Sequence, residues 1–119
     1  ADIMYAERFG VADAAVERGV KAIGNVIDTS ADYPNTILAS AIWHMEPTID
    51  RAIANVASGN WEAADYGQYS FMAYGGGSIV VDENLVPADV LAKVQAREQE
   101  ILDGLFRVNV NDARPVSDQ

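Results

Sequence analysis

The sequence contains no cysteine and a single histidine, His44. Without cysteine the chain cannot form a disulfide, a thiol nucleophile or a Cys-ligated zinc site, and one histidine cannot build a His-based metal cluster. Basic residues are also scarce, because 8 Lys and Arg stand against 18 Asp and Glu for a formal net charge of -10. Such a surface repels phosphate backbones, so we expect no nucleic-acid partner. No apolar run approaches the roughly 18 residues that a membrane-spanning helix needs.

Motifs for nucleotide binding and catalysis are missing as well. The sequence has neither GxGxxG after its first predicted strand nor GxxxxGK[ST], so the usual backbone cradles for phosphate are absent. The spacing singles out no pair of carboxylates, and an acidic surface explains the acidic residues more simply. We therefore expect no enzyme and no cofactor, and a structural role for His44. An enzyme that uses Asp28 or Glu7 as a base is a minor alternative, because no nucleophile is paired with a base.

The first part of the chain predicts a strand–helix–strand unit. Residues 3–5 form a short apolar run, residues 11–18 have helical spacing with Gly19 as a stop, and residues 20–27 are rich in β-branched side chains. Two strands joined by a helix in this way are almost always parallel, with a right-handed crossover. The fold class predicted is therefore α/β, a mostly parallel sheet flanked by helices. A chain of 119 residues that is 50% hydrophobic should form one domain and bury about two thirds of its unfolded surface.

The remaining elements follow after a polar loop at 28–35. Residues 36–42 read as a third strand, and residues 46–57 as a helix whose apolar stripe lies on the sheet. Two short β-like runs, 66–71 and 78–81, flank a glycine turn at 75–77. A last helix extends from 86 to 103, and the alternation at 106–110 is typical of an edge strand.

Six short segments, in this order and spacing, resemble one known family. They are 1–4 (ADIM), 19–24 (GVKAIG) followed by Asp28, 34–40 (PNTILAS), 58–61 (SGNW), 85–90 (LVPADV) and 100–104 (EILDG). No single segment is specific, but together they extend over nearly the whole chain. On these residues the chain resembles the carboxy-terminal part of the basic membrane protein (Bmp) family, the substrate-binding lipoproteins of ABC importers that include purine nucleoside receptors.

The resemblance implies a two-lobed periplasmic-binding-protein fold of type I, of which residues 1–119 supply one α/β lobe. It places hinge crossover segments near 36–42 and 66–77. It implies a purine nucleoside or nucleobase-like ligand in the cleft between lobes, and an ABC permease as partner. The chain should also pair with an amino-terminal lobe or with a second copy of itself. The family is exported to the periplasm or attached by lipid to the outer face of the plasma membrane.

Candidate ligand contacts follow from geometry and from the resemblance. Ligands of open α/β sheets bind outside the carboxyl ends of parallel strands, which favours the loops after the first two strands. The candidates there are Arg8, Phe9, Asp28 and Thr29. The resemblance implies that Asp28 bonds the hydroxyls of a nucleoside sugar, although this residue could simply cap a turn. Phe9 could stack on a base or pack locally.

Three departures from the family pattern bear on the ligand. Trp43 stands where many nucleoside-binding members have lysine, and it could form a flat apolar wall. Ala12 stands where the family's stacking aromatic ring belongs. Val26 occupies the first place of the family's acidic pair, so the sequence leaves room for a free base or another small ring. The alternative to a transport role is a small stand-alone regulatory or oligomerising α/β domain.

Overall fold

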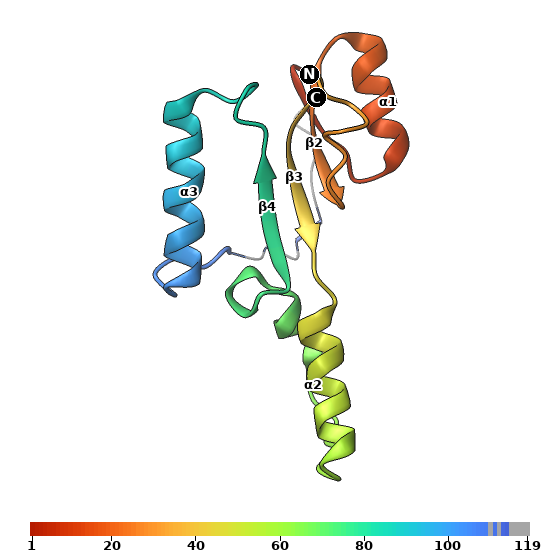
Figure 1. Cartoon of the computed structure of the whole chain (residues 1–119), viewed down its shortest axis with the longest axis vertical. Coiled ribbons are helices and arrows are strands. Elements are labelled where there is room, and N and C mark those ends of the chain that lie inside the picture. Colours follow the sequence, from red (N-terminus) through yellow and green to blue (C-terminus); the bar gives the residue numbers. More distant parts are fainter. Residues whose placement is uncertain (110, 112, 115–119) are drawn as a thin grey trace.

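The computed structural model describes residues 1–109, 111, 113 and 114. Within these residues the chain forms one four-stranded sheet, three α-helices and two short 3-10 helices (Figure 1). The strands lie in the order β1-β2-β3-β4, which is also their order in the chain. In sequence order the elements are β1 (Ile3–Tyr5), α1 (Phe9–Arg18), β2 (Lys21–Val26), β3 (Ile37–Trp43), α2 (Glu46–Ala57), η1 (Tyr66–Ser70), η2 (Met72–Tyr74), β4 (Gly77–Val81) and α3 (Ala88–Leu102).

The predicted strand–helix–strand unit is confirmed. β1 pairs in parallel with β2, and β2 pairs in parallel with β3. Helix α1 packs on one face of β1 and β2 through the buried alanines Ala12 and Ala15, which meet Ala22 and Ile37 in the core. Small side chains let the helix backbone approach the sheet closely. Gly19 ends the helix at a φ of +63°, where a side chain would be strained.

β2 and β3 are joined by a loop rather than a helix. The loop, residues 27–36, folds back along the sheet so that β3 can start beside the beginning of β2. Backbone bonds from Asp32 and Tyr33 to the carbonyl of Thr29 give it a helical turn, and a bond from Ala22 to the carbonyl of Thr36 docks its end on β2. The polar loop predicted at 28–35 is therefore confirmed, and it is an ordered connection.

β4 lies antiparallel to β3, with Val80 opposite Ser40 and Gly77 opposite Trp43. The strand predicted at 78–81 is confirmed, whereas the β-like run predicted at 66–71 is wrong. That segment forms 3-10 turns instead, because the Asp65 carboxylate accepts a hydrogen bond from the Gly67 N–H and starts η1.

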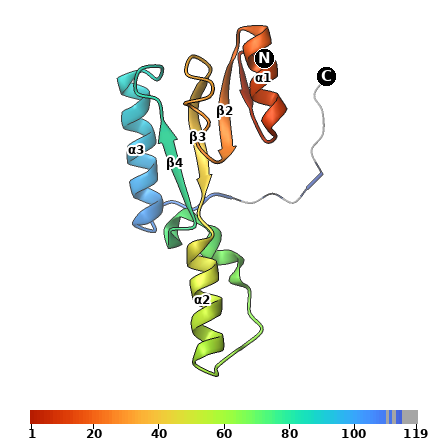
Figure 2. The ribbon, with the colours of Figure 1, turned by 45° about the vertical axis from the view of Figure 1, so that its right-hand side comes forward.

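Helix α2 forms where the sequence predicts it, but its apolar stripe does not lie on the sheet. The helix points away from the sheet, as both views show (Figures 1 and 2). Its main packing partner is η1, in the chain that returns from it. Ile49, Ile53 and Val56 are 49%, 60% and 63% exposed. The stripe is thus an apolar surface that the described residues leave uncovered.

The edge strand predicted at 106–110 is not formed over 106–109, and Val110 lies outside the described residues. Helix α3 ties this stretch down instead. The backbone N–H groups of Leu105 and Phe106 both bond the carbonyl of Glu100, and the Arg97 guanidinium lies 3.9 Å from the centre of the Phe106 ring. These contacts occupy the backbone that would begin a strand.

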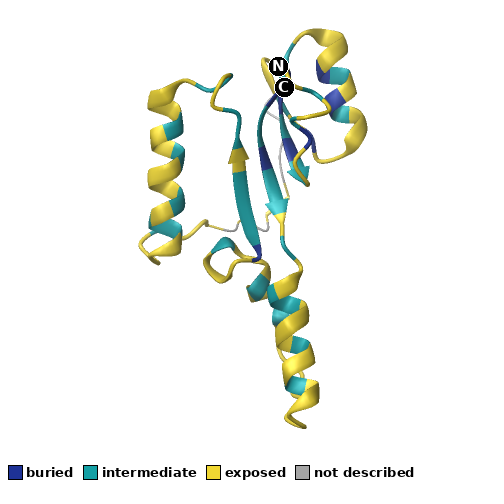
Figure 3. Ribbon diagram, viewed as in Figure 1, coloured by how far each residue is buried: buried dark blue, intermediate teal, exposed yellow. Residues whose placement is uncertain are grey.

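The molecule is more open than its length predicts (Figure 3). Its accessible surface is 8965 Å², against about 6,300 Å² for a compact monomer of this mass. Its radius of gyration is 17.3 Å, against about 13.5 Å for a compact chain of this length. The expected burial of two thirds of the unfolded surface is therefore not reached, because α2 and α3 cover little of the sheet. No helix among the described residues is both long and apolar enough to cross a membrane.

Candidate functional site

A small hollow lies at the carboxyl ends of β1 and β2, where ligands of open α/β sheets bind. Its lining comes from the β1–α1 turn, the start of α1, the end of β2 and the loop after β2: Ala6, Glu7, Arg8, Phe9, Ala12, Gly24, Asn25, Val26, Thr29 and Tyr33. Its volume of about 60 Å³ admits only a small part of an organic ligand, because pockets that enclose such ligands have volumes of about 300–1,000 Å³. A ligand seated here would extend out of this lobe.

Arg8 and Phe9 reach the hollow because they form the entry to α1. Arg8 is extended, with φ −131° and ψ 154°, and Phe9 is the first helical residue. Arg8 pairs with Glu7 at 3.0 Å, but both side chains are largely exposed, so this pair contributes little to stability. Phe9 is 71% exposed. Its ring is thus available to a ligand rather than engaged in packing.

Thr29 closes the hollow from the loop after β2, and Gly24 makes room for it. A Cβ on Gly24 would lie 3.0 Å from the Thr29 hydroxyl oxygen and 2.6 Å from that of Ser40. Real Cβ atoms do not come within 2.6 Å of such an oxygen, so any larger residue at position 24 would require Ser40 to shift and would crowd Thr29. Thr29 is 8% exposed as a result.

Asp28 is not among the residues that line this hollow, and its side chain is held by two hydrogen bonds. Its Oδ1 accepts a bond of 3.0 Å from the Ser30 N–H and one of 3.2 Å from the Ser40 hydroxyl. The backbone bond from Ser30 is the main cause that lowers the pKa of Asp28, while partial burial opposes it. The turn cap that the sequence left open for Asp28 is thus present.

Trp43 lies on the other face of β3 from Asp28. Ser40, which bonds Asp28, and Trp43 are three residues apart on one strand, and successive side chains of a strand alternate between faces. Trp43 is 58% exposed. The structure therefore brings Arg8, Phe9 and Thr29 together, and it does not bring Asp28 and Trp43 to a shared rim.

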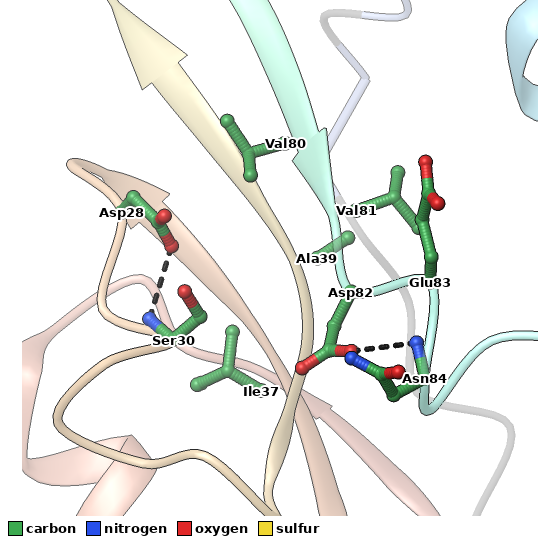
Figure 4. A pocket seen from close by; sticks show the side chains of 9 residues that line it. All are labelled: Asp28, Ser30, Ile37, Ala39, Val80, Val81, Asp82, Glu83 and Asn84. Atoms are coloured by element: carbon green, nitrogen blue, oxygen red, sulfur yellow. Dashed lines mark hydrogen bonds between the residues drawn. The ribbon is translucent and has the colours of Figure 1, made fainter.

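A larger and more open hollow of about 330 Å³ lies between the loop after β2 and the end of β4. Figure 4 shows Asp28 and Ser30 on one side of it and Asp82, Glu83 and Asn84 on the other. Asp82 accepts a bond from the Asn84 N–H at 2.8 Å and so caps its own turn. Among the described residues no group of three His, Cys, Asp or Glu side chains is placed to hold a metal ion.

Tyr33 and Val26 also line the first hollow, and neither was predicted as a ligand contact. The Tyr33 hydroxyl donates a hydrogen bond of 2.8 Å to Asp13 on α1, and this bond raises the pKa of Tyr33. Val26 is the last residue of β2 and has a φ of +75°. A lone tyrosine in a polar loop gives no sequence signal for the bond of Tyr33 to Asp13.

No protein-family model matches this sequence, and no curated protein matches it either. Solved structures do match its fold. A transcriptional activator of the comK gene from Bacillus halodurans aligns with a TM-score of 0.67 at 20% identity, over 86% of this chain and 37% of that one. An ABC transporter solute-binding protein from Conexibacter woesei aligns with a TM-score of 0.55 at 21% identity, over 92% of this chain and 37% of that one.

A third match is an ABC transporter solute-binding protein from Aeropyrum pernix, with a TM-score of 0.63 at 14% identity, over 95% of this chain and 41% of that one. The chain thus spans about two fifths of the length of these proteins. At such identities the matches show the fold alone: the chain has the α/β fold of part of these proteins, which confirms the predicted fold class. They do not test the resemblance to the Bmp family.

Proposed function

We propose that this chain is part of a solute-binding protein of an ABC importer, of the Bmp type, and that it captures a purine nucleoside or nucleobase without catalysing a reaction on it. The observation that carries the proposal is the hollow at the carboxyl ends of β1 and β2, where Arg8, Phe9 and Thr29 meet. This is the ligand-binding edge of the sheet in open α/β folds. The likeness of the fold to two ABC solute-binding proteins supports it.

The small volume of the hollow supports a ligand that is shared between two lobes. The described lobe supplies an exposed phenylalanine and a guanidinium, and a second α/β lobe would cover the rest of the ligand. The uncovered stripe of α2 and the excess accessible surface support a second lobe, or a second copy of this chain, that packs on this one. A ligand then stabilises the closed arrangement through its higher affinity for it.

The chain leaves the sheet toward α2 at His44 and returns to the sheet at Gly76, and these two crossings are suited to act as the hinge. They run side by side, because the His44 N–H bonds the carbonyl of Gly76 at 3.0 Å and the His44 ring meets the Ser78 hydroxyl at 2.8 Å. The predicted hinge segment 66–77 includes one of these passages. The other segment, 36–42, lies almost wholly within β3, so its role as a hinge stays a prediction.

Partners and location follow from the same proposal. A solute-binding protein of this kind delivers its ligand to a membrane permease, and it acts outside the plasma membrane, in the periplasm or held by a lipid. The acidic composition, with a net charge of -10, supports the absence of a nucleic-acid partner.

A thermal-shift screen of the natural full-length protein against nucleosides and nucleobases tests the ligand. At least one purine should raise the Tm. Phe9→Ala should reduce that shift, since stacking of a base on an aromatic ring contributes about 1–3 kcal/mol, while the Tm without ligand should change little because Phe9 is exposed. Trp61→Ala, a change at another exposed ring that lies outside the hollow and outside the predicted hinge segments (57% exposed), is the control. No shift with any purine would refute the proposed ligand class.

A second candidate is a regulatory or oligomerising domain without a transport role. The alignment with a transcriptional activator over 86% of this chain favours it. Co-purification with a membrane permease would support transport. Co-purification with a soluble regulatory partner, together with a stable dimer in light scattering, would support the regulatory candidate instead.

A further inference from the structure

Strand β1 lies at one edge of the sheet. Among the described residues it pairs only with β2, and no strand lies on its other side. Its bonds to β2 come from alternate residues, because the Asp2 carbonyl accepts a bond from the Lys21 N–H and the Ala6 N–H donates one to β2. Successive residues of a strand direct their backbone N–H and C=O groups to opposite sides. The backbone groups of Ile3 and Tyr5 therefore face away from β2.

Three backbone groups at this edge are available to a further strand. The Tyr5 carbonyl is already used locally, since it accepts a bond of 3.0 Å from the Glu7 N–H. The Ile3 N–H, the Ile3 carbonyl and the Tyr5 N–H have no backbone partner among the described residues. Unpaired groups of this kind form a template on which another strand can pair.

The side chains next to these groups are apolar and exposed. Met4 packs against the core under α1, so its neighbours Ile3 and Tyr5 project from the opposite face of the sheet. They are 53% and 55% exposed. β1 is short, but it carries neither lysine nor proline, the residues that commonly keep an open edge from pairing.

The direction of the strands also indicates that the sheet continues past β1. β1, β2 and β3 are mutually parallel. Parallel strands occur almost only where both faces of the sheet are covered. Helix α1 covers one face of β1, whereas Ile3 and Tyr5 leave the other face open within the described part of the chain. β1 thus has the composition of an inner strand at the position of an edge strand.

Charge and length indicate which polypeptide supplies the next strand. A second copy of this chain is disfavoured, because each copy has a net charge of -10 and the two would repel each other. Proteins with this fold contain more chain, since residues 1–119 cover only 37–41% of the three matched structures. A longer polypeptide of this kind has the length to supply a strand without that repulsion between copies.

We propose that the sheet continues beyond β1, and that the occupant of this edge is a strand of the same polypeptide from outside residues 1–119. This strand bonds the Ile3 N–H, the Ile3 carbonyl and the Tyr5 N–H. The inference concerns a surface other than the candidate ligand site and the α2 stripe, and it does not depend on the ligand proposed above.

Amide hydrogen exchange in the natural full-length protein, resolved by residue with NMR, tests the pairing. The Ile3 and Tyr5 amides should exchange at least about 100-fold more slowly than in an unstructured peptide, as paired strand amides do. Met4, whose backbone faces β2, is the internal control and should be protected in either case. Free exchange at Ile3 and Tyr5 beside a protected Met4 would overturn the proposal.

The same measurement at a 10-fold lower protein concentration identifies the occupant. Protection at Ile3 and Tyr5 that does not change on dilution supports a strand of the same polypeptide. Protection that falls on dilution would assign the edge to a second copy and so overturn the proposed occupant.

Ile3→Pro provides a test through stability, with Ile3→Ala as the matched control. Both substitutions remove the apolar side chain, but only proline also removes the N–H. In the natural full-length protein the Tm of Ile3→Pro should lie below that of Ile3→Ala by about 4 °C or more, because a bond to the added strand is lost. Proline is tolerated at an open edge where the N–H faces solvent. Equal Tm values for the two variants would therefore overturn the proposal and leave the proposed ligand unaffected.

Discussion

The hydroxyl of Ser40, fully buried in the middle of β3, donates a hydrogen bond of 3.2 Å to the carboxylate of Asp28. The same carboxylate oxygen accepts the Ser30 N–H, so one side chain both starts the loop after β2 and attaches it to the sheet. The loop in turn places Thr29 in the candidate site. Asp28 therefore acts on the site through the loop, whether or not it also contacts the ligand.

Asp28→Ala should lower the free energy of unfolding at pH 7 by about 0.5–1 kcal/mol, as expected for partly exposed hydrogen bonds. The pKa of Asp28 is lowered below its ordinary value of 3.8 in the folded protein. Its contribution is thus complete above the unfolded pKa and is lost as the pH falls through the folded pKa. Urea unfolding at pH 7 and at pH 2.5 should show a difference from wild type that shrinks at the lower pH.

Asp89→Asn is the control for this measurement. Asp89 pairs with Lys93 at 3.3 Å on the surface of α3, where both side chains are more than 70% exposed. Its removal should change stability by less than about 0.5 kcal/mol. An Asp28→Ala protein as stable as wild type at pH 7 would contradict the anchoring role of Asp28.

Gly24→Ala should destabilise the protein by about 1–3 kcal/mol, because the added Cβ would lie 2.6 Å from the Ser40 hydroxyl oxygen in a fully buried place. Chemical denaturation measures the loss. Ser40→Ala in the same chain should restore part of it, since the closest contact disappears.

Gly10→Ala provides the matched comparison, because nothing lies within 4 Å of the position of its Cβ and the residue is in α1. It should stabilise the protein slightly, by up to about 1 kcal/mol. Equal effects of the two substitutions would show that the close approach at Gly24 is not as described.

Tyr33→Phe should lower the denaturation midpoint and loosen the loop from α1, because it removes the bond to Asp13. That bond raises the pKa of Tyr33 above its ordinary value of 10.0. The contribution of the phenol is therefore complete below pH 10 and is lost as the pH rises through the folded pKa.

Thermal unfolding between pH 8 and pH 11 checks this expectation. Wild type should lose its advantage over Tyr33→Phe at the alkaline end, whereas Tyr74→Phe, at an exposed position, should behave like wild type throughout. A constant difference between wild type and Tyr33→Phe across this range would speak against ionisation of Tyr33 as its cause.

Ile53→Glu should leave the stability of the folded monomer within about 0.5 kcal/mol, because Ile53 is 60% exposed on the uncovered stripe of α2. It should reduce any self-association of the chain, since the stripe is the surface we expect a second lobe or copy to cover. Light scattering across a range of concentrations measures the effect.

Ile37→Ala should have the opposite effects: it should lower stability and leave self-association unchanged. Ile37 is fully buried, so its truncation should cost about 2–5 kcal/mol without a specific effect on association. Self-association that Ile53→Glu leaves unchanged would mean that the α2 stripe is not the contact surface.

Much of the local structure could be predicted from the sequence, because it depends on local patterns. The apolar periodicity predicted the three α-helices, and the β-branched runs predicted the strands within a residue or two. The predicted edge strand did not form over residues 106–109, because Arg97 and Glu100 on the preceding helix bind the start of this segment through contacts that periodicity does not encode. The strand predicted at 66–71 did not form, because the Asp65 cap starts a 3-10 helix in spite of the β propensity of this segment.

The sequence by itself determined the α/β class, the parallel strand–helix–strand unit and the loops that carry Arg8, Phe9, Asp28 and Thr29. Each of these follows from side-chain period and turn residues within a short stretch of chain. Only the tertiary structure decided that Asp28 is turned to Ser40, that Trp43 lies on the other face, and that the α2 stripe is left uncovered. These features depend on strand register and on how distant segments pack. Neighbouring side chains of a strand point to opposite faces of the sheet, so a shift of the register by a single position changes which residues meet.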